Sequence, residues 1–292
     1  MIPRHRSRTE KIDLRGLRYN VRHWGPQEAP AVFFLHGRMD CSPTFQFVVD
    51  ALQQQWHVIA PDWRGYGESE WLGRPYWFYD YYADLHALLE HYSPQRPARI
   101  VAHSMGANIA GSYAGARPER VAQLVMLDFL GLKRSFDDTS PRLIDAWLKD
   151  LRREPVPRIF YHTDEFAGRL LDLNPRLTPE RAAFLARATS RVRDDGALDV
   201  ACDPWQRIAA PTVYHAEDAM ECWRKITAPV QLQVAEHGLI RQRFGGDPAE
   251  FSRRAGCFQN LTQVTVEDSG HNVQHDQPEQ VAAHLEAFLT RD

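Results

Sequence analysis

The residues with the clearest chemical potential lie in one short stretch around Ser104. The segment IVAHSMG, residues 100–106, predicts a strand that runs into Ser104 and a helix that leaves directly from it. Small residues stand two positions before and after the serine, Ala102 and Gly106, and they permit the tight turn that such a serine needs. The alternative is a serine that only caps its helix. The strand before it and the helix after it favour an exposed nucleophile above the edge of a sheet.

A second candidate, His271, lies in the Gly270-His271 pair near the end of the chain. It follows a strand predicted over residues 263–267 and precedes a helix predicted over residues 278–290. A neutral imidazole at the carboxyl end of a strand can take a proton from a serine and later return it. His275 is nearby, but it falls on the approach to the helix and is the weaker candidate.

A third feature is the segment His36-Gly37-Arg38, which follows an apolar run over residues 31–35. Gly37 permits a backbone turn that other residues resist. The backbone N–H of Arg38, together with that of Met105, can then point at an oxyanion. Paired donors of this kind stabilise a tetrahedral intermediate more than the planar substrate. The sequence therefore predicts an oxyanion hole formed by these two N–H groups.

The elements that must position these residues alternate between strands and helices. Strands are predicted over residues 17–23, 31–35, 57–60, 99–102, 123–127, 229–235 and 263–267, and helices over 45–55, 79–91, 105–117 and 278–290. This rhythm predicts an α/β fold with a mainly parallel twisted sheet and helices on both faces. Between residues 134 and 227 the pattern becomes helical without clear strands. We therefore expect a core over 1–133 and 228–292, with a helical cap inserted over 134–227.

Composition narrows the possible functions further. The chain has 292 residues, of which 43% are hydrophobic and 25% charged, as expected of a globular protein. A formal net charge of −3 gives no electrostatic reason to expect binding to nucleic acid or to an anionic membrane. No apolar run approaches the length of a membrane span, and Met1 to Lys11 lacks the apolar stretch of a signal peptide. We expect a cytoplasmic protein that acts on a small molecule and could form a homo-oligomer.

The sequence offers no sign of a metal or a cofactor. The four cysteines are scattered, and no CxxC pair is present. Neither a phosphate-binding loop nor a dinucleotide fingerprint occurs. We therefore expect chemistry without a cofactor or a metal.

Four motifs together resemble the α/β-hydrolase fold family and stand in the order of that family. They are His36-Gly37, the segment DWRGYGES over residues 62–69, the turn at Ser104, and Gly270-His271. The resemblance covers roughly the first 135 and the last 65 residues of the chain. The pieces QLVMLD, VQLQVAEHG and SGHNVQH are also similar to the serine hydrolase-like proteins within that family. The resemblance implies an α/β-hydrolase fold in which the DWRGYGES loop is mainly structural.

The third member of a serine–histidine–acid triad remains open at this point. Family members usually carry the acid after the strand that follows the insertion, but here Gly238 takes that position. Asp128, at the end of the strand over residues 124–127, is the favoured acid. Glu236 is the alternative, if the loop is shifted by two residues. Both satisfy the chain order nucleophile, acid, histidine.

The sequence thus predicts a cofactor-independent serine hydrolase of the esterase type that cleaves a carboxylic ester, or a related acyl bond, through an acyl-enzyme. Ser104 would be the nucleophile, His271 the general base, and Asp128 or Glu236 the acid. One alternative is C–C bond or amide hydrolysis on the same triad, because a fold does not determine chemistry. Another is a non-catalytic small-molecule receptor of the same fold, which the glycine at the usual acid position would explain. Haloalkane dehalogenases and epoxide hydrolases of this fold use an aspartate nucleophile, so Ser104 argues against both.

Overall fold

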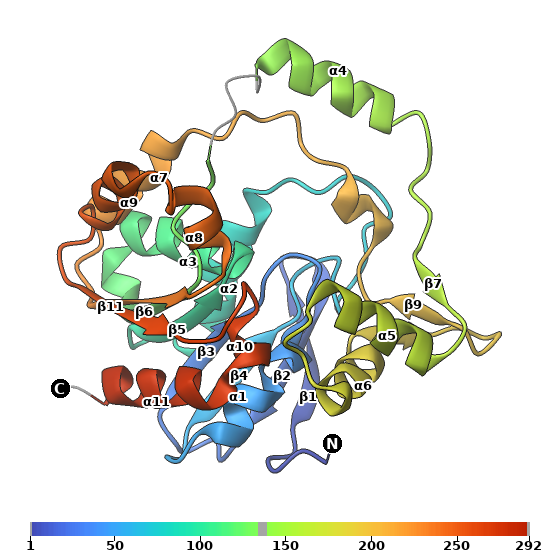
Figure 1. Cartoon of the computed structure of the whole chain (residues 1–292), viewed down its shortest axis with the longest axis horizontal. Coiled ribbons are helices and arrows are strands. Elements are labelled where there is room, and N and C mark those ends of the chain that lie inside the picture. Colours follow the sequence, from blue (N-terminus) through green and yellow to red (C-terminus); the bar gives the residue numbers. More distant parts are fainter. Residues whose placement is uncertain (1, 134–138, 291–292) are drawn as a thin grey trace.

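A computed structural model of the chain describes residues 2–133 and 139–290 (Figure 1). Its centre is an eight-stranded sheet with the order β1-β2-β4-β3-β5-β6-β10-β11. The first two strands and β4 are joined in antiparallel pairs, and all other neighbours are parallel. The strands are β1 (Arg8–Leu14), β2 (Leu17–Trp24), β3 (Ala31–Leu35), β4 (His57–Pro61), β5 (Ala98–His103), β6 (Val121–Leu127), β10 (Val230–Ala235) and β11 (Leu261–Val266). The expected mainly parallel sheet is confirmed.

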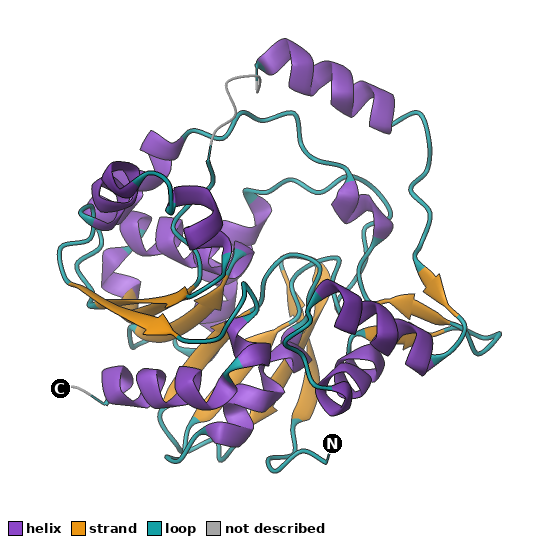
Figure 2. Ribbon diagram, viewed as in Figure 1, coloured by secondary structure: helices purple, strands orange, loops and turns teal. Residues whose placement is uncertain are grey.

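Helices cover both faces of this sheet (Figure 2). One face packs against α1 (Gln46–Ala51) and α11 (Pro278–Leu289), and the other against α2 (Asp80–Tyr92), α3 (Met105–Ala116) and α7 (Ala216–Arg224). The strand residues divide between the two faces by alternation, as the two-residue period of a strand requires. In β5, Ile100 and Ala102 belong to one hydrophobic cluster and Val101 to the other. The remaining helices of the core are α8 (Leu239–Phe244), α9 (Pro248–Ala255) and α10 (Val273–Asp276), with 3-10 turns at Ser42–Phe45 and Pro118–Arg120.

The segment between β6 and β10 forms a small module of mixed structure. It contains α4 (Ser140–Asp150), β7 (Ile159–Phe160), α5 (Thr163–Leu173), α6 (Pro179–Ala188), β8 (Ser190–Val192), β9 (Leu198–Val200) and η3 (Pro204–Arg207). The three strands form an antiparallel sheet with the order β7-β9-β8. Besides the expected helices, the region therefore contains three short strands that were not predicted from the sequence. Strands of two or three residues are too short to show the alternation by which strands are identified in a sequence.

This module has its own hydrophobic cluster, which meets the core at α1. Phe160, Phe166 and Leu185 are buried in it together with Phe47 of α1. The ring of Phe47 also packs against Phe184 of α6, with ring centroids 5.4 Å apart. By contrast, none of the residues of α4 is buried, and in Figure 1 this helix stands apart from the rest of the molecule.

The end of the predicted insertion differs from its middle part, because its last helix packs on the core. The division of the chain at residues 133 and 227 stays a prediction, and its first boundary adjoins residues 134–138, outside the described ranges. Within the predicted insertion, α7 packs on α3 rather than on the other inserted elements. Trp223 of α7 is fully buried in the cluster that includes Ile109 of α3. A Cβ added at Gly115 would lie only 2.0 Å from the backbone oxygen of Cys222, so glycine permits the close approach of the two helices.

Candidate active site

Ser104 lies in the sharp turn between β5 and α3. Its backbone has φ 50° and ψ −111°, a strained combination for a residue other than glycine. Gly106 makes the turn possible, because a Cβ at that position would lie 2.3 Å from the backbone oxygen of Leu35 in β3. The predicted strand, turn and helix are confirmed. The turn holds the serine at the carboxyl end of the central strand β5, and the side chain of the serine is only partly buried.

The imidazole of His271 bridges Ser104 and Asp128. Its Nε2 lies 2.9 Å from Oγ of Ser104, and its Nδ1 lies 2.8 Å from Oδ2 of Asp128. An ionised carboxylate can only accept a hydrogen bond, so Nδ1 carries the proton and donates a hydrogen bond to Asp128. Nε2 is then free of a proton and can accept one from the serine hydroxyl. The structure thus brings together three residues that lie far apart in the sequence, one each after β5, β6 and β11.

Asp128 is placed by the end of β6 and by the start of α8. Its backbone has a positive φ of 46°. The carboxylate accepts hydrogen bonds from the backbone N–H of Leu239 at 2.6 Å and from that of Ala235 at 3.3 Å. These donors leave Oδ2 directed at His271. The carboxylate also fills the space beside Gly238, where an added Cβ would lie 2.2 Å from Oδ2. A side chain at position 238, where the family usually carries its acid, would therefore collide with the carboxylate of Asp128.

Glu236, the alternative acid, lies outside this arrangement. Its Oε2 accepts a hydrogen bond from the backbone N–H of Asp268 at 2.8 Å, and Oε1 lies 3.8 Å from Nε2 of His237. About half of its side chain is exposed to solvent, with a relative accessibility of 48%. Between the two candidates, the structure places Asp128 and not Glu236 against His271.

Burial shifts the pKa values of both His271 and Asp128. It lowers the pKa of His271 to about 4, and the positive charge of Arg243 acts in the same direction. The imidazole is therefore neutral at pH 7 and able to accept a proton. Burial also raises the pKa of Asp128 above its ordinary value, while the backbone N–H groups of Leu239 and Ala235 oppose this rise by stabilising the carboxylate.

The loop after β3 packs directly on the serine turn. A Cβ added at Gly37 would lie 3.1 Å from Cβ of Ser104. His36 fixes the loop from behind, since its Nδ1–H donates to the carbonyl of Gly37 at 2.7 Å while its Nε2 accepts from the backbone N–H of Trp63 at 2.9 Å. Arg38 follows this loop and lines the same cavity as Ser104. That the N–H groups of Arg38 and Met105 form an oxyanion hole stays a prediction.

The DWRGYGES loop is structural, as the family resemblance implies. The carboxylate of Asp62 accepts hydrogen bonds from the backbone N–H groups of Ser42 at 2.7 Å and Glu68 at 2.9 Å, and from the side chain of Asn20. Gly67 has a positive φ of 53°, and an added Cβ would lie 2.2 Å from this carboxylate. The loop thereby ties β2 and β4 to the turn that precedes α1.

A second histidine, His103, holds the backbone of His271 and was not predicted from the sequence to belong to the site. Its Nε2–H donates to the carbonyl oxygen of His271 at 2.9 Å. Its Nδ1 lies 3.4 Å from the side-chain nitrogen of Gln274, which also reaches Oγ1 of Thr44 at 3.3 Å. Burial holds the pKa of His103 well below its usual range, so it stays neutral. The one available signal was its place directly before Ser104, at the end of a strand.

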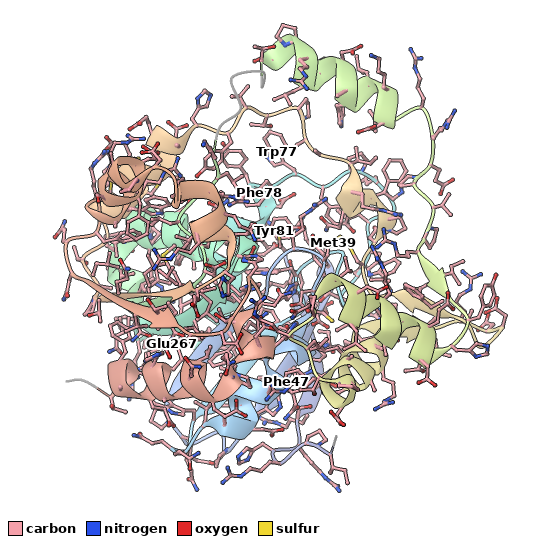
Figure 3. All side chains as sticks on the ribbon, viewed as in Figure 1. Met39, Phe47, Trp77, Phe78, Tyr81 and Glu267 are labelled. Atoms are coloured by element: carbon pink, nitrogen blue, oxygen red, sulfur yellow. The ribbon has the colours of Figure 1, made fainter. Side chains whose placement is uncertain are left out.

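A cavity of about 280 Å³ opens beside the serine and histidine. It lies between the core and the inserted module, and Figure 3 labels Met39, which lines it from the core side. Much of the wall from the inserted module is apolar: Phe160, Phe166, Leu170, Leu173, Leu177, Leu185 and Val200. The described residues hold no group of three or more His, Cys, Asp or Glu side chains arranged to bind a metal. No helix within the described ranges is long and apolar enough to cross a membrane.

Comparison with known proteins agrees with this architecture. Residues 30–162 match the family described as "alpha/beta hydrolase fold", a range that includes β3, the loop after it and the serine turn. The chain has the α/β-hydrolase fold. It resembles a "Serine hydrolase-like protein" of Danio rerio, at 29% identity over 277 residues that make up 91% of this chain and 83% of the relative. This confirms the expected fold and the resemblance to serine hydrolase-like proteins.

Two further proteins resemble this chain. A "Haloalkane dehalogenase" of Bradyrhizobium diazoefficiens is 34% identical over 112 residues, which cover 37% of this chain and 35% of that protein. The solved structure of a "Thioesterase Domain From Curacin Biosynthetic Pathway" superposes with a TM-score of 0.84 at 22% identity, covering 97% of this chain and 99% of the other. At that identity, the structural likeness establishes the fold alone.

Proposed function

We propose that the protein is a cofactor-independent serine hydrolase that cleaves a carboxylic ester, or a related acyl bond, of a small molecule. The observation that carries this proposal is the pair of hydrogen-bonding distances at His271, 2.9 Å to Oγ of Ser104 and 2.8 Å to Oδ2 of Asp128. A nucleophile, a base and an orienting acid in line are what acyl transfer requires.

The reaction would proceed in two halves through an acyl-enzyme. Nε2 of His271 takes the proton of the Ser104 hydroxyl while Oγ attacks the carbonyl carbon, and the carbonyl oxygen becomes an oxyanion. The backbone N–H groups of Arg38 and Met105 are the proposed donors to that oxyanion. When the intermediate collapses, the leaving group takes the proton from His271. Water then attacks the acyl-enzyme, with its proton passing to His271, and the acid product is released as Oγ is reprotonated.

The position of Asp128 argues against the receptor alternative. That alternative arose because Gly238 stands where the family commonly carries its acid, and Asp128 supplies a carboxylate to His271 from the neighbouring strand. The serine also favours acyl transfer over the displacement chemistry suggested by the haloalkane dehalogenase relative, because attack by a hydroxyl oxygen on a carbonyl carbon gives an ester that water can hydrolyse.

The proposal is tested with a fluorophosphonate probe and a generic aryl ester. We expect the probe to label the wild-type chain at Ser104 and the ester to be hydrolysed, and Ser104→Ala to abolish both. The control is Ser112→Ala, which alters another serine of α3 and should leave labelling and hydrolysis intact. A folded wild-type protein that neither reacts with the probe nor hydrolyses any of a panel of esters and thioesters would refute the proposal.

A further inference from the structure

We infer that the substrate carries an anionic group, a carboxylate or a phosphate, which is bound by arginines that line the cavity beside Ser104. The inference rests on the proposed function and adds a substrate class to it. Arg38 follows the loop after β3, Arg158 precedes β7, Arg169 lies in α5 and Arg207 ends η3. Four separate segments of the chain therefore bring an arginine to the wall of one cavity of about 280 Å³.

None of these four arginines forms an ion pair with a carboxylate among the described residues. Arg38 donates to the backbone oxygen of Gln206 at 3.0 Å, and Arg207 donates to the backbone oxygens of Pro204 and Val156. These acceptors are neutral. Elsewhere in the described ranges, arginines commonly pair with carboxylates, as do Arg15, Arg64, Arg117, Arg120, Arg181, Arg191, Arg193, Arg253 and Arg254. The cavity therefore holds four solvent-exposed arginines whose charges no carboxylate among the described residues balances through an ion pair.

The only acidic side chain lining the cavity within the described residues is Asp40. Its Oδ1 accepts a hydrogen bond from the backbone N–H of Cys41 at 2.9 Å, and burial raises its pKa to about 7. One carboxyl group, whether ionised or not, cannot balance the charges of four arginines. Since the whole chain has a formal net charge of −3, the positive cavity is a local concentration and not a result of general basicity.

The cavity wall also shows how a substrate could lie. Phe160 and Phe166 stack with ring centroids 4.5 Å apart and are buried in the inserted module, beside Arg158 and Arg169. The apolar wall can hold a carbon chain, while the planar guanidinium groups can form paired hydrogen bonds with a carboxylate or phosphate. The substrate would thus present its acyl carbon to Ser104 and its charge to the arginines.

The test compares substrates that differ only in charge. The first pair is mono-4-nitrophenyl glutarate and 4-nitrophenyl valerate, which place or omit a carboxylate on the acyl chain. The second pair is butyryl coenzyme A and S-butyryl-N-acetylcysteamine, which place or omit phosphate on the leaving group. The measured quantity is the ratio of kcat/KM for the anionic substrate to that for the neutral one. The wild-type ratio should be about tenfold or more in one pair, as expected of a charge-assisted contact, and the pair that shows it locates the charge.

The variants Arg158→Gln, Arg169→Gln and Arg207→Gln should each lower this ratio toward one. Arg96→Gln is the matched control, because Arg96 is exposed in the loop before β5, at the end of that strand opposite Ser104, and its ratio should equal that of the wild type. Thermal unfolding of each variant checks that it is folded. The inference would be overturned if the wild type hydrolysed neutral and anionic substrates equally in both pairs, or if the arginine variants kept the full ratio. Neither result would contradict the proposed serine hydrolase function. Failure of the fluorophosphonate to label Ser104 would instead overturn the proposed function, and the inference with it.

Discussion

The glycine at position 238 provides a sharp test of the role of Asp128. Gly238→Ala would add a Cβ only 2.2 Å from Oδ2 of Asp128 and 2.6 Å from its Cγ. The backbone at Gly238, with φ −87° and ψ −167°, can be adopted by alanine without strain. The effect of the substitution must therefore come from this contact and from the neighbouring side chain of Ala235, which lies 2.5 Å from the added carbon.

The size of the effect follows from these distances. Carbon and oxygen atoms that are not bonded need a separation of about 3.2 Å or more, so the carboxylate must retreat by about 1 Å. The atom that moves is the same Oδ2 that accepts from Nδ1 of His271 at 2.8 Å. A misplacement of this size costs on the order of a hundredfold in rate, and complete loss of the contact costs about 10⁴-fold. Overpacking should also lower the free energy of unfolding by about 1–3 kcal/mol.

The assay is kcat/KM for an aryl ester, together with urea unfolding. Gly246→Ala is the control, because no atom lies within 4 Å of a Cβ added there. If Gly238→Ala acts through Asp128, then adding it to Asp128→Ala should reduce the rate no further, since the two changes remove one interaction. A folded Gly238→Ala variant with wild-type kcat/KM would refute the reasoning, as would losses that simply multiply in the double variant.

Two further predictions concern the acid and the buried histidines. Asp128→Asn should lower kcat/KM for an aryl ester by about 10⁴-fold with little change in thermal stability. Glu236→Gln should leave kcat/KM unchanged. The reverse ranking of the two variants would show that the acid is misassigned. Burial lowers the pKa of His36 to about 4 and that of His275 to about 3, so below their ordinary value of 6.5 the unfolded chain binds protons that the folded chain does not. The free energy of unfolding should therefore fall as pH drops from 6.5 toward 4, by up to about 1.4 kcal/mol per pH unit for each histidine. Urea unfolding between pH 7.5 and 5 measures this slope, and His275→Gln should reduce it by about one proton; an unchanged slope in that variant would contradict the account.

Much of the core could be predicted from the sequence because its signals are local. A continuous apolar run marks a strand covered on both faces, and Ser104 and His271 each come directly after such a strand. In a parallel sheet the carboxyl ends of the strands share one edge, so residues that follow strands are expected to meet there. The structure brings Ser104 and His271 together at that edge, with Oγ of the serine 2.9 Å from Nε2 of the histidine.

The acid could not be decided in this way because Asp128 and Glu236 follow neighbouring strands, β6 and β10. Both reach the same edge, and only the direction of each side chain separates them. The backbone of Asp128, with its positive φ, turns the carboxylate toward His271, while Glu236 points to the N–H of Asp268. Backbone angles of this kind have no clear signature in the identity of an aspartate.

The convergence of the cavity arginines could not be predicted from the sequence, for a different reason. Arg158, Arg169 and Arg207 belong to an inserted segment whose strands, β7, β8 and β9, are two or three residues long. Their convergence depends on how this segment folds over the core, which no periodic pattern in the sequence encodes. Arg38 could be placed near Ser104 from its motif, but the acceptor of its side chain, the backbone of Gln206, lies 168 residues away.

The direct pairing of β6 with β10 has a consequence for how this protein could diversify. The inserted segment leaves from one of these strands and returns to the other, so its two ends are anchored side by side in the sheet. Lengthening a loop between fixed anchors is inexpensive, at about 0.6 kcal/mol for each doubling. The segment that shapes the pocket can therefore be exchanged, shortened or extended while the reactive residues, which sit on the strand ends, keep their places. Grafting inserts from relatives onto this sheet would be a practical route to new substrate preferences.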